Sequence, residues 1–501
     1  MVTPTESVPN IETPLDLLHR LQQLRAEIYR EGYEQFETWC STIRQRSFLI
    51  GGLNLACYLA LRRRDLRDLQ AALAPLGLSS LGRSEPRVLA NLDAVIATLA
   101  DICRLPLKQR PPRPSDHAFK RGERMLDHNA RRVLGASSSD RRVRIMVTMP
   151  TEAATDRALI GDLIGRGMSW ARINCAHDDA DVWSAIISNV RDTAQTQKRE
   201  CRILMDLGGP KARTGEVLAP KSRKRLTIGD QLLLTRGKPQ SSKTYPFQVE
   251  CLIPEVFDQV QVGASIWIDD GRIGTQIESI GAEGAVLRVT NAREKGEKVR
   301  PDKGLNFPDT ELQLSPLTED DRRDLDFVVE HADAIGYSFV QSAVDVALLQ
   351  QELKARMGED HAHQMIIIAK IETAKAVRNL PEIIVQGAGQ QPFGIMIARG
   401  DLAVEIGFER MAEIQEELLW LCEAAHVPVI WATQVLENFV KEGLPSRAEM
   451  TDAAMSERAE CVMLNKGAFV AEAVTVLDHI LTRMQGNQSK KTPQLRALHS
   501  W

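Results

Sequence analysis

From residue 143 onward, short apolar segments rich in Ile, Val and Met alternate with longer segments of helical periodicity. The apolar segments lack the polar–apolar alternation of a half-exposed strand, so each is predicted to be a strand buried on both faces. Eight such strands, each followed by a helix, are typical of the (β/α)8 TIM barrel, an α/β fold. The eight predicted strands are 143–150, 170–175, 202–207, 332–340, 365–372, 393–400, 427–433 and 461–465.

One interval between consecutive strands is far too long for a single helix. Roughly 110 residues separate the third predicted strand from the next helical segment. They contain short alternating segments at 225–237, 265–280 and 285–290, with glycines at the turns. We therefore predict a small all-β domain inserted after strand 3. Because active sites of such barrels lie at the carboxyl ends of the strands, this domain is expected to act as a lid.

The region before the barrel is predicted to be an all-α N-terminal domain, because leucines recur there at helical spacing. Its most apolar stretch, 48–61, is 14 residues long, whereas a bilayer-spanning helix needs about 20, so we expect a buried helix and no membrane association. Residues 104–144 then carry twelve Lys and Arg against four Asp and Glu. We interpret this basic stretch as a solvated or domain-docking surface, with contact to an anionic ligand as the alternative.

These patterns together give a complete predicted domain organisation. The predicted segments are a helical N-terminal domain (1–107), a basic linker (108–142), the first part of the barrel (143–212), the inserted lid domain (213–304), the second part of the barrel (305–487) and a C-terminal tail (488–501).

Charge and cysteine content exclude several classes of protein. The net charge of −4 argues against a whole-protein nucleic-acid binder. The eight cysteines are scattered without a CxxC pair, which disfavours a zinc site or a disulfide framework and fits a reducing cytoplasm. The first residues show no signal peptide, so a cytoplasmic location is expected.

Polar residues gather at the carboxyl ends of the predicted barrel strands. Lys370 and Glu372 share one face of their strand, because they lie two residues apart, and Asp401 follows the next strand. Two carboxylates on neighbouring strands are a usual arrangement for Mg²⁺. Lys370 beside that ion would place positive charge where a phosphoryl group or an enolate develops negative charge. Arg172 can hold a phosphate with its planar guanidinium.

The segments that carry these residues resemble the pyruvate kinase family. The motifs "MSWARINCAHDD", "MDLGGPKARTG", "WIDDGRI", "DKGLNFPD", "IIIAKIE", "FGIMIARGDLAVEI", "VPVIWATQVLENF" and "PSRAEMTDAA" occur in the family's order between about 143 and 485. The resemblance implies a glycolytic phosphotransferase that moves phosphate from phosphoenolpyruvate to ADP, giving pyruvate and ATP. It also implies a homo-oligomer.

The resemblance assigns roles to residues that match the family's motifs. It implies that Glu372 and Asp401 hold Mg²⁺ or Mn²⁺, that Lys370 stabilises the transition state and that Arg172 contacts phosphate. It implies that Thr433 lies near the enolate carbon and acts in its protonation. The implied substrate-binding residues are Ala398, Gly400, Asp401 and Thr433. The implied nucleotide-binding residues are His177, Arg213, Asp270 and Lys303.

The region where many family members bind K⁺ differs in this chain. The implied region contains Asn174, Asp206, Leu207 and Lys211. The serine of the family's "RxNxS" motif is missing, and Lys211 stands where the family's "DTKGPE" motif has its glutamate. Because a fixed ammonium can supply the charge that K⁺ would bring, we predict that K⁺ is not required.

Three departures from the family pattern leave other functions open. The loop after strand 8 reads "MLNKGAFVAEAV" and lacks the usual glutamate–threonine pair, the first strand ends in "TMPTEA", and we expect no C-terminal regulatory domain. One alternative is a Mg²⁺-dependent lyase or aldolase acting on pyruvate-like enolates. Another is a non-catalytic protein that senses phosphoenolpyruvate. The role of the helical domain, the effector and the nucleotide preference stay open.

Overall fold

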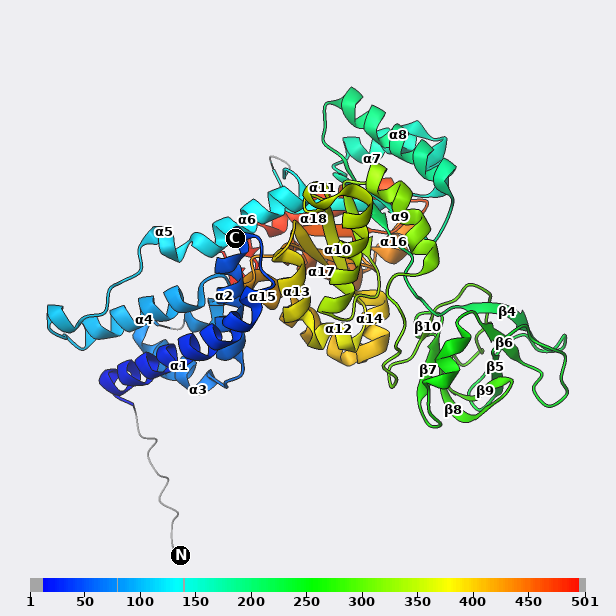
Figure 1. Cartoon of the computed structure of the whole chain (residues 1–501), viewed down its shortest axis with the longest axis horizontal. Coiled ribbons are helices and arrows are strands. Elements are labelled where there is room, and N and C mark those ends of the chain that lie inside the picture. The colour runs from blue at the N-terminus through cyan, green and yellow to red at the C-terminus, as the bar shows by residue number, and fades with distance from the viewer. Residues whose placement is uncertain (1–11, 79, 138–139, 495–501) are drawn as a thin grey trace, which may run out of the picture.

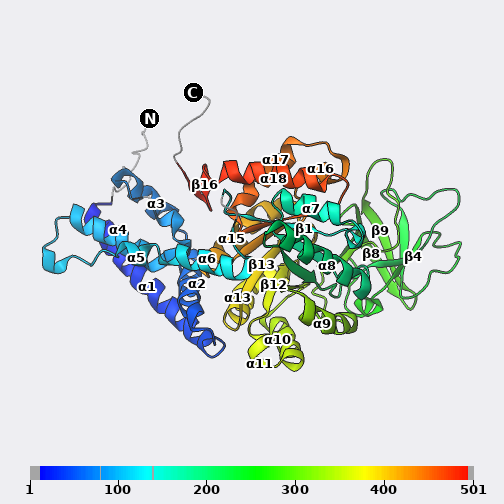
Figure 2. The same cartoon turned by 90° about the horizontal axis from the view of Figure 1, so that it is seen from above.

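The computed structural model describes residues 12–78, 80–137 and 140–494. The parts of the predicted N-terminal domain, basic linker and C-terminal tail that fall on residues 1–11, 79, 138–139 and 495–501 lie outside the described residues. Figures 1 and 2 show three parts in a row, with the helical region and the β domain on opposite sides of the barrel.

The central part is a closed barrel of eight parallel strands, which confirms the predicted fold class. Its strands neighbour one another in the order β1-β15-β14-β13-β12-β11-β3-β2. Every barrel strand falls within one of the eight apolar segments identified in the sequence. The strands are β1 (Arg144–Thr148), β2 (Trp170–Asn174), β3 (Arg202–Asp206), β11 (Ala334–Tyr337), β12 (Ile366–Ile371), β13 (Phe393–Ala398), β14 (Val429–Ala432) and β15 (Cys461–Leu464).

Helices cover the outside of the barrel. Several begin at a side-chain cap. At the start of α9 the Thr318 hydroxyl accepts from the Asp321 backbone N–H at 3.0 Å, and the Asp321 carboxylate accepts from the Thr318 backbone N–H at 2.9 Å. The longer helices are α7 (Arg157–Gly165), α8 (Ala180–Gln197), α9 (Glu319–His331), α10 (Ala343–Met357), α13 (Leu380–Ala388), α15 (Phe408–Ala424) and α18 (Val470–Met484). The shorter ones are α11 (Glu359–Ala362), α12 (Ala374–Arg378), α14 (Arg399–Ile406), α16 (Glu437–Glu442) and α17 (Arg447–Met455).

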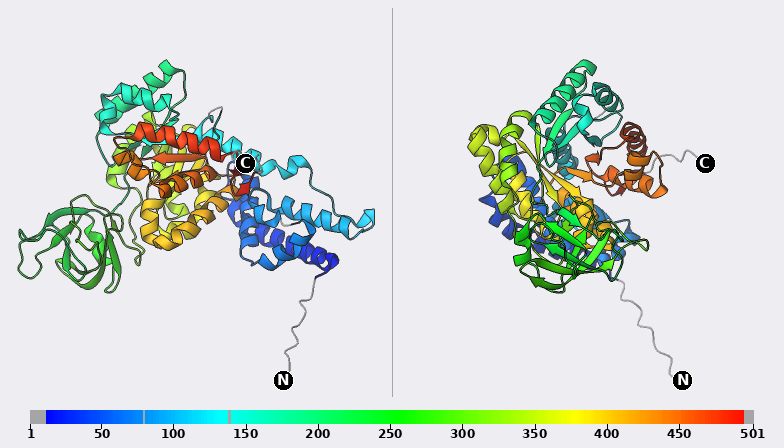
Figure 3. Two further views of the ribbon diagram at one scale, coloured as in Figure 1. Left: turned by 180° about the vertical axis from the view of Figure 1, so that it is seen from behind. Right: turned by 90° about the vertical axis from the view of Figure 1, so that its right-hand side faces the viewer.

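The β domain is inserted between β3 and β11, after the third barrel strand as predicted. It forms one sheet in the order β10-β7-β8-β9-β5-β6-β4 and has its own apolar core. Figure 3 shows it held to the barrel by two chain segments and otherwise projecting away. Its strands are β4 (Thr214–Leu218), β5 (Gln231–Thr235), β6 (Gln248–Cys251), β7 (Ser265–Ile268), β8 (Ile273–Gly281), β9 (Gly284–Asn291) and β10 (Leu305–Asn306).

The N-terminal region is helical, as predicted. It contains α1 (Pro14–Cys40), α2 (Leu49–Arg62), α3 (Arg67–Leu73) and α4 (Val88–Ile102). The apolar stretch 48–61, predicted to be a buried helix, corresponds to α2, which packs against α1, α4 and α15. In the described ranges, no helix combines the length and apolar character that crossing a membrane requires.

Two further helices, α5 (Asp116–Phe119) and α6 (Arg121–Leu134), lie in the segment predicted as a basic linker. The last residues of α6, Val133 and Leu134, join the apolar residues of the barrel interior. There the Trp170 indole N–H donates to the Leu134 carbonyl at 2.9 Å. Because Trp170 opens β2, α6 closes the amino-terminal end of the barrel, opposite the expected active site.

The helical region and the barrel meet along α2 and α15, where polar contacts supplement the apolar packing. The Asn54 amide on α2 donates to the Glu85 carbonyl at 2.7 Å and to the Ala424 carbonyl at 2.8 Å. His426, which lies just upstream of β14, is 1% exposed, and its imidazole Nε2 bonds the Pro86 carbonyl at 3.1 Å.

A small C-terminal hairpin, β16 (Gln488–Ser489) and β17 (Thr492–Pro493), closes this junction (Figure 2). The Lys490 ammonium forms an ion pair with Glu460, a buried barrel acid. The Lys491 ammonium pairs with Glu85, a buried acid of the helical region. Each lysine therefore neutralises a carboxylate that is almost inaccessible to solvent, one on each side of the junction.

His426 gives this junction a predictable dependence on pH. Burial lowers the pKa of His426 from its ordinary 6.5 to about 4, so the unfolded chain binds a proton that the folded chain does not. The contribution of neutral, buried His426 to the free energy of unfolding is complete above about pH 6.5 and is lost as pH falls toward 4. Between pH 7 and pH 5 the free energy of unfolding should drop by about 2 kcal/mol more than in His426→Gln. Urea unfolding at both pH values measures this difference, and equal drops would contradict it.

Candidate active site

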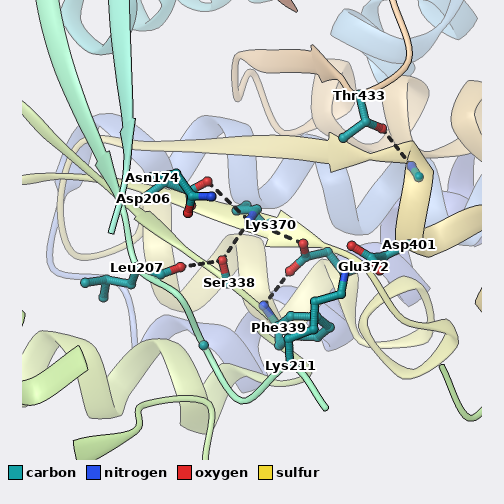
Figure 4. Close-up of polar contacts among 12 residues, drawn as sticks. Asn174, Asp206, Leu207, Lys211, Ser338, Phe339, Lys370, Glu372, Asp401 and Thr433 are labelled. Carbon is teal, nitrogen blue, oxygen red and sulfur yellow. Dashed lines mark hydrogen bonds and ion pairs between the residues drawn. The ribbon is translucent and has the colours of Figure 1, made fainter. Parts of the chain in front are cut away.

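Lys370 lies at the centre of a cluster of polar groups at the carboxyl end of the barrel (Figure 4). Its ammonium donates to the Ser338 hydroxyl at 2.7 Å and lies 3.3 Å from a carboxylate oxygen of Glu372. It lies at the same distance from a carboxylate oxygen of Asp206. The side chain is 11% exposed, so its charge acts in a mostly water-free environment, where electrostatic effects are stronger.

Two carboxylates, Glu372 after β12 and Asp401 in the first turn of α14, face the same space (Figure 4). The backbone N–H of Phe339 fixes Glu372 by donating to it at 2.6 Å. Burial is the main reason that the pKa of Glu372 is raised; the charge of Lys370 opposes this shift and that of Asp401 adds to it. Two carboxylates held toward one space in this way suit a hard divalent cation.

Lys211 contacts Asp401. Its ammonium donates to an Asp401 carboxylate oxygen at 2.7 Å, and the Asn306 amide approaches the same oxygen at 3.4 Å. Burial disfavours both charges of this pair, but their mutual attraction outweighs it, so the pKa of Lys211 is raised and that of Asp401 is lowered. Lys211 was predicted to belong to the K⁺ region, but its ammonium bonds Asp401, an acid expected to hold the divalent ion.

The absence of a side chain at Gly304 leaves room for the side chain of Lys211. A Cβ on Gly304 would lie 2.7 Å from the Lys211 Cε and 3.9 Å from an Asp270 carboxylate oxygen. Gly304 directly precedes β10, the edge strand of the β-domain sheet, and Lys211 lies on the segment that enters the domain between β3 and β4. The β domain therefore contributes Gly304 and Asp270 to the surroundings of Lys211.

Asp206 is the most deeply buried acid of the cluster, with no exposed surface. Arg172 donates to it through Nε at 2.8 Å and through a second nitrogen, and also to the Thr148 hydroxyl at 3.1 Å. Burial opposes the charge of Asp206, but Lys370 and Arg172 overcome it and lower its pKa. A Cβ on Gly336 would lie 2.5 Å from an Asp206 carboxylate oxygen, so β11 carries glycine where this acid enters.

The remaining residues of the implied K⁺ region lie beside this acid. Asn174 pairs with Asp206 in the β2–β3 register, and its side-chain oxygen accepts from the Ala176 N–H at 3.3 Å. The Leu207 carbonyl accepts from the Ser338 hydroxyl at 2.7 Å. Ser338 therefore links Lys370 to this carbonyl. Sequence reasoning missed Ser338, although a polar residue directly after β11 is a signal of the kind that identified the others.

Thr433 adopts φ of +63°, a left-handed conformation that is strained for a β-branched residue. Its hydroxyl accepts from the Gly400 N–H at 2.6 Å, so this amide of the implied substrate site is engaged. Arg399 holds the strained turn by donating to the Thr433 carbonyl at 2.7 Å and pairing with Asp452. Neither Arg399 nor Asp452 was identified from sequence. Ala398, the last residue of β13, is buried and directly precedes Arg399.

The residues implied in nucleotide binding divide into two groups. His177 lines a polar cavity of about 320 Å³ together with Arg172, Asn174, Lys441 and Lys466. Burial, followed by the charges of Lys466 and Arg213, lowers the pKa of His177, so its imidazole is neutral at pH 7.

The second group lies where the β domain joins the barrel. Arg213 pairs with Asp302 at 3.1 Å, and Lys303 pairs with Asp269 at 3.2 Å. These two cations are therefore partly neutralised by neighbouring acids. The positive charge of Arg213 also helps to lower the pKa of His177, so this arginine acts on the residue that lines the polar cavity.

Comparison with known proteins gives a consistent result. Residues 140–474 match the family model described as pyruvate kinase, barrel domain. The chain is 34% identical over 374 residues to a human protein named pyruvate kinase PKLR, covering 72% of this chain and 61% of the human protein. It is 32% identical over 353 residues to pyruvate kinase from Geobacillus stearothermophilus, covering 69% of this chain and 57% of that protein. The chain thus spans less than two thirds of the length of these relatives.

A solved structure agrees with this result. A crystal structure of a pyruvate kinase from Cryptosporidium parvum superposes with a TM-score of 0.61 at 29% identity. The superposition covers 71% of this chain and 72% of that one.

Proposed function

The chain belongs to the pyruvate kinase family, and on this basis we propose that it transfers phosphate from phosphoenolpyruvate to ADP. The observation that carries the proposal is the cluster in which Lys370 lies 3.3 Å from Glu372, with Asp401 facing the same space. In this transfer the bond between phosphorus and the enol oxygen breaks, and a bond to a terminal ADP oxygen forms. The resulting enolate takes up a proton at carbon and becomes pyruvate.

Glu372 and Asp401 fit a divalent metal ion. Glu372 is buried, Asp401 is half-buried, and Asp401 already pairs with the ammonium of Lys211 at 2.7 Å, so the position favours a cation. We propose that these two acids hold Mg²⁺ or Mn²⁺. Such an ion, when bound, neutralises phosphate oxygens and helps to orient them.

The chain's own cationic side chains are proposed to stabilise the negative charge that the metal ion does not neutralise. Lys370 lies in a nearly water-free position, where its ammonium can stabilise negative charge that develops on the transferring group and on the enolate oxygen. Arg172 is oriented by Asp206 and presents its guanidinium at the polar cavity. Thr433 lies beside Gly400, where we propose that the enolate carbon is protonated.

We propose that ADP occupies the polar cavity next to His177 and Lys466, with Arg213 and Lys303 approaching its phosphates from the β-domain side. Asp270 is assigned to this side as well, since it lies beside Gly304. The cavity of about 320 Å³ falls within the range of small-ligand sites.

Activity is expected without K⁺. The Lys211 ammonium supplies a fixed positive charge in the cluster, and its ion pair with Asp401 keeps it protonated. In a coupled assay with phosphoenolpyruvate, ADP and Mg²⁺ in Tris buffer, replacing KCl by tetramethylammonium chloride at constant ionic strength should leave the rate unchanged. Lys211→Met should lose most of the activity in the K⁺-free buffer.

Two results separate the parts of this proposal. A strong stimulation of the unmodified protein by K⁺ would contradict K⁺ independence but not phosphoryl transfer. No ATP formation under either condition would contradict the proposed function itself.

We further propose a cytoplasmic homo-oligomer. All eight cysteines are free thiols, as expected for a reducing compartment, and family membership favours assembly. Light scattering on the purified chain measures its oligomeric state, and a monomeric mass would contradict the assembly.

A further inference from the structure

Glu405 lies one helical turn after Asp401 on α14, so the two carboxylates share one face of this helix. In the described ranges Glu405 has no ion-pair partner; the nearby ammonium of Lys211 pairs with Asp401 instead. The Glu405 Oε1 accepts from the Asn306 amide at 3.2 Å and from the Phe307 backbone N–H at 3.3 Å. Both donors come from the β domain, so this acid of the barrel is hydrogen-bonded across the domain boundary.

The alternation of side chains at β10 explains how these donors reach the barrel. Leu305 and Phe307 are each 3% exposed and belong to the apolar core of the β domain. Because successive side chains of a strand point to opposite faces, Asn306 between them points out of this core and toward α14. β10 is the edge strand of its sheet and contacts α14 (Figure 1). This short segment is therefore anchored in the β domain on one face and to the barrel on the other.

The Asn306 amide lies between two acids of α14. It donates to Glu405 at 3.2 Å and approaches Asp401 at 3.4 Å. The amide nitrogen carries two hydrogens, so it can serve both carboxylates. Asn306 is 3% exposed, so water cannot readily replace these bonds. Glu405 therefore holds in place a residue that also neighbours a proposed metal ligand.

A second contact joins the β domain to the same part of the barrel. A Cβ on Gly271 would lie 3.2 Å from the Phe408 ring and 3.4 Å from a Val404 methyl group. The turn between β7 and β8 therefore rests against the end of α14 and the start of α15. By contrast, the ion pair of Arg378 with Glu311 is exposed and is of the kind that contributes little.

We propose that Glu405 is a positioning residue, whose bonds to β10 hold the β domain over the cluster; this role rests on the proposed phosphoryl transfer. ADP is proposed to meet Arg213 and Lys303 from the β-domain side, and Lys303 lies three residues before Asn306. Without Glu405 these cations are no longer fixed relative to the barrel, so ADP binds more weakly. Phosphoenolpyruvate is proposed to be held by residues of the barrel strands, so its binding is expected to change little.

Glu405→Met and Glu405→Gln test this role, because both keep the length of the side chain. Both N–H groups donate to Oε1, so a glutamine oxygen can accept them, whereas methionine offers only a weak acceptor. Glu405→Met should raise KM for ADP about 10-fold and leave KM for phosphoenolpyruvate within about 2-fold. Glu405→Gln should restore KM for ADP. Glu413→Met is the matched control, because it removes an exposed acid from the next helix and should change neither constant.

Hydrogen exchange tests the contact without turnover. In the absence of substrates, the Phe307 backbone N–H should exchange about 10-fold faster in Glu405→Met than in the unmodified protein or in Glu405→Gln. If Glu405→Met does not fold, Asn306→Ala removes the amide donor from the other side and should raise KM for ADP in the same way.

Three results would overturn the proposal: an unchanged KM for ADP in the folded Glu405→Met protein, a Glu405→Gln protein as impaired as Glu405→Met, or unchanged exchange at Phe307. If the unmodified protein formed no ATP, the proposed function would fail, while the exchange rates would still decide whether Glu405 holds β10.

Discussion

Lys370→Met is expected to lower kcat for ATP formation from phosphoenolpyruvate by at least about 10³-fold. The side chain of Lys370 is 11% exposed and its ammonium lies 3.3 Å from both Glu372 and Asp206, so water cannot replace its charge. Methionine keeps the length and apolar stem of the side chain but not the charge. Stabilisation of charge that develops during phosphoryl transfer is therefore lost, while the shape of the site is kept.

The control for this variant is Lys354→Met, which removes a lysine charge from α10, where it lies 3.8 Å from Glu359. This variant should keep full activity. Titration with Mn²⁺ followed by electron paramagnetic resonance should show that Lys370→Met still binds the metal. If Lys370→Met retained more than about a tenth of the rate, Lys370 would not be the group that stabilises the transition state.

Asp401→Asn is expected to weaken Mn²⁺ binding at least about 100-fold and to abolish turnover at ordinary Mg²⁺ concentrations. Even the loss of groups that only support a metal ligand costs 10- to 100-fold, so the loss of a carboxylate ligand itself should cost at least as much. Asparagine keeps the side-chain shape and still accepts the hydrogen bond from Lys211 that Asp401 accepts at 2.7 Å.

Glu409→Gln is the matched control, because Glu409 is an exposed acid in the first turn of the next helix, α15. It should bind Mn²⁺ as the unmodified protein does. Thermal unfolding of Asp401→Asn checks that the fold persists with Lys211 facing a neutral partner. Unchanged Mn²⁺ affinity in the folded Asp401→Asn protein would remove this acid from the metal site.

The barrel could be predicted because its strands are buried on both faces. Segments such as 365–372 and 393–400 contain almost only apolar residues before their terminal polar groups, and the structure places β12 and β13 there. The helix α2 was equally predictable from its apolar length. The helix α6 could not be predicted, because prolines precede it and its many charges favoured a solvated linker. Its burial depends on contacts of Val133 and Leu134 with the barrel interior, which the local sequence does not show.

Only those residues of the candidate site that lie at the ends of barrel strands could be predicted from the sequence. Lys370, Glu372 and Asp401 stand directly at the carboxyl ends of neighbouring strands, and this spacing is visible in the sequence. The partner of Lys211 was not predictable, since 190 residues separate it from Asp401 and the path of the β domain decides their contact. The same holds for Arg399, whose role depends on the backbone conformation of the turn at Thr433.

The C-terminal hairpin has a consequence for how the molecule unfolds. Lys490 forms an ion pair with Glu460 of the barrel, and Lys491 forms one with Glu85 of the helical region. The two lysines are nevertheless adjacent in one short turn. Pulling the helices off the barrel must strip a counter-ion from a buried acid on at least one side. The two parts therefore share one thermodynamic unit, and neither is expected to melt alone.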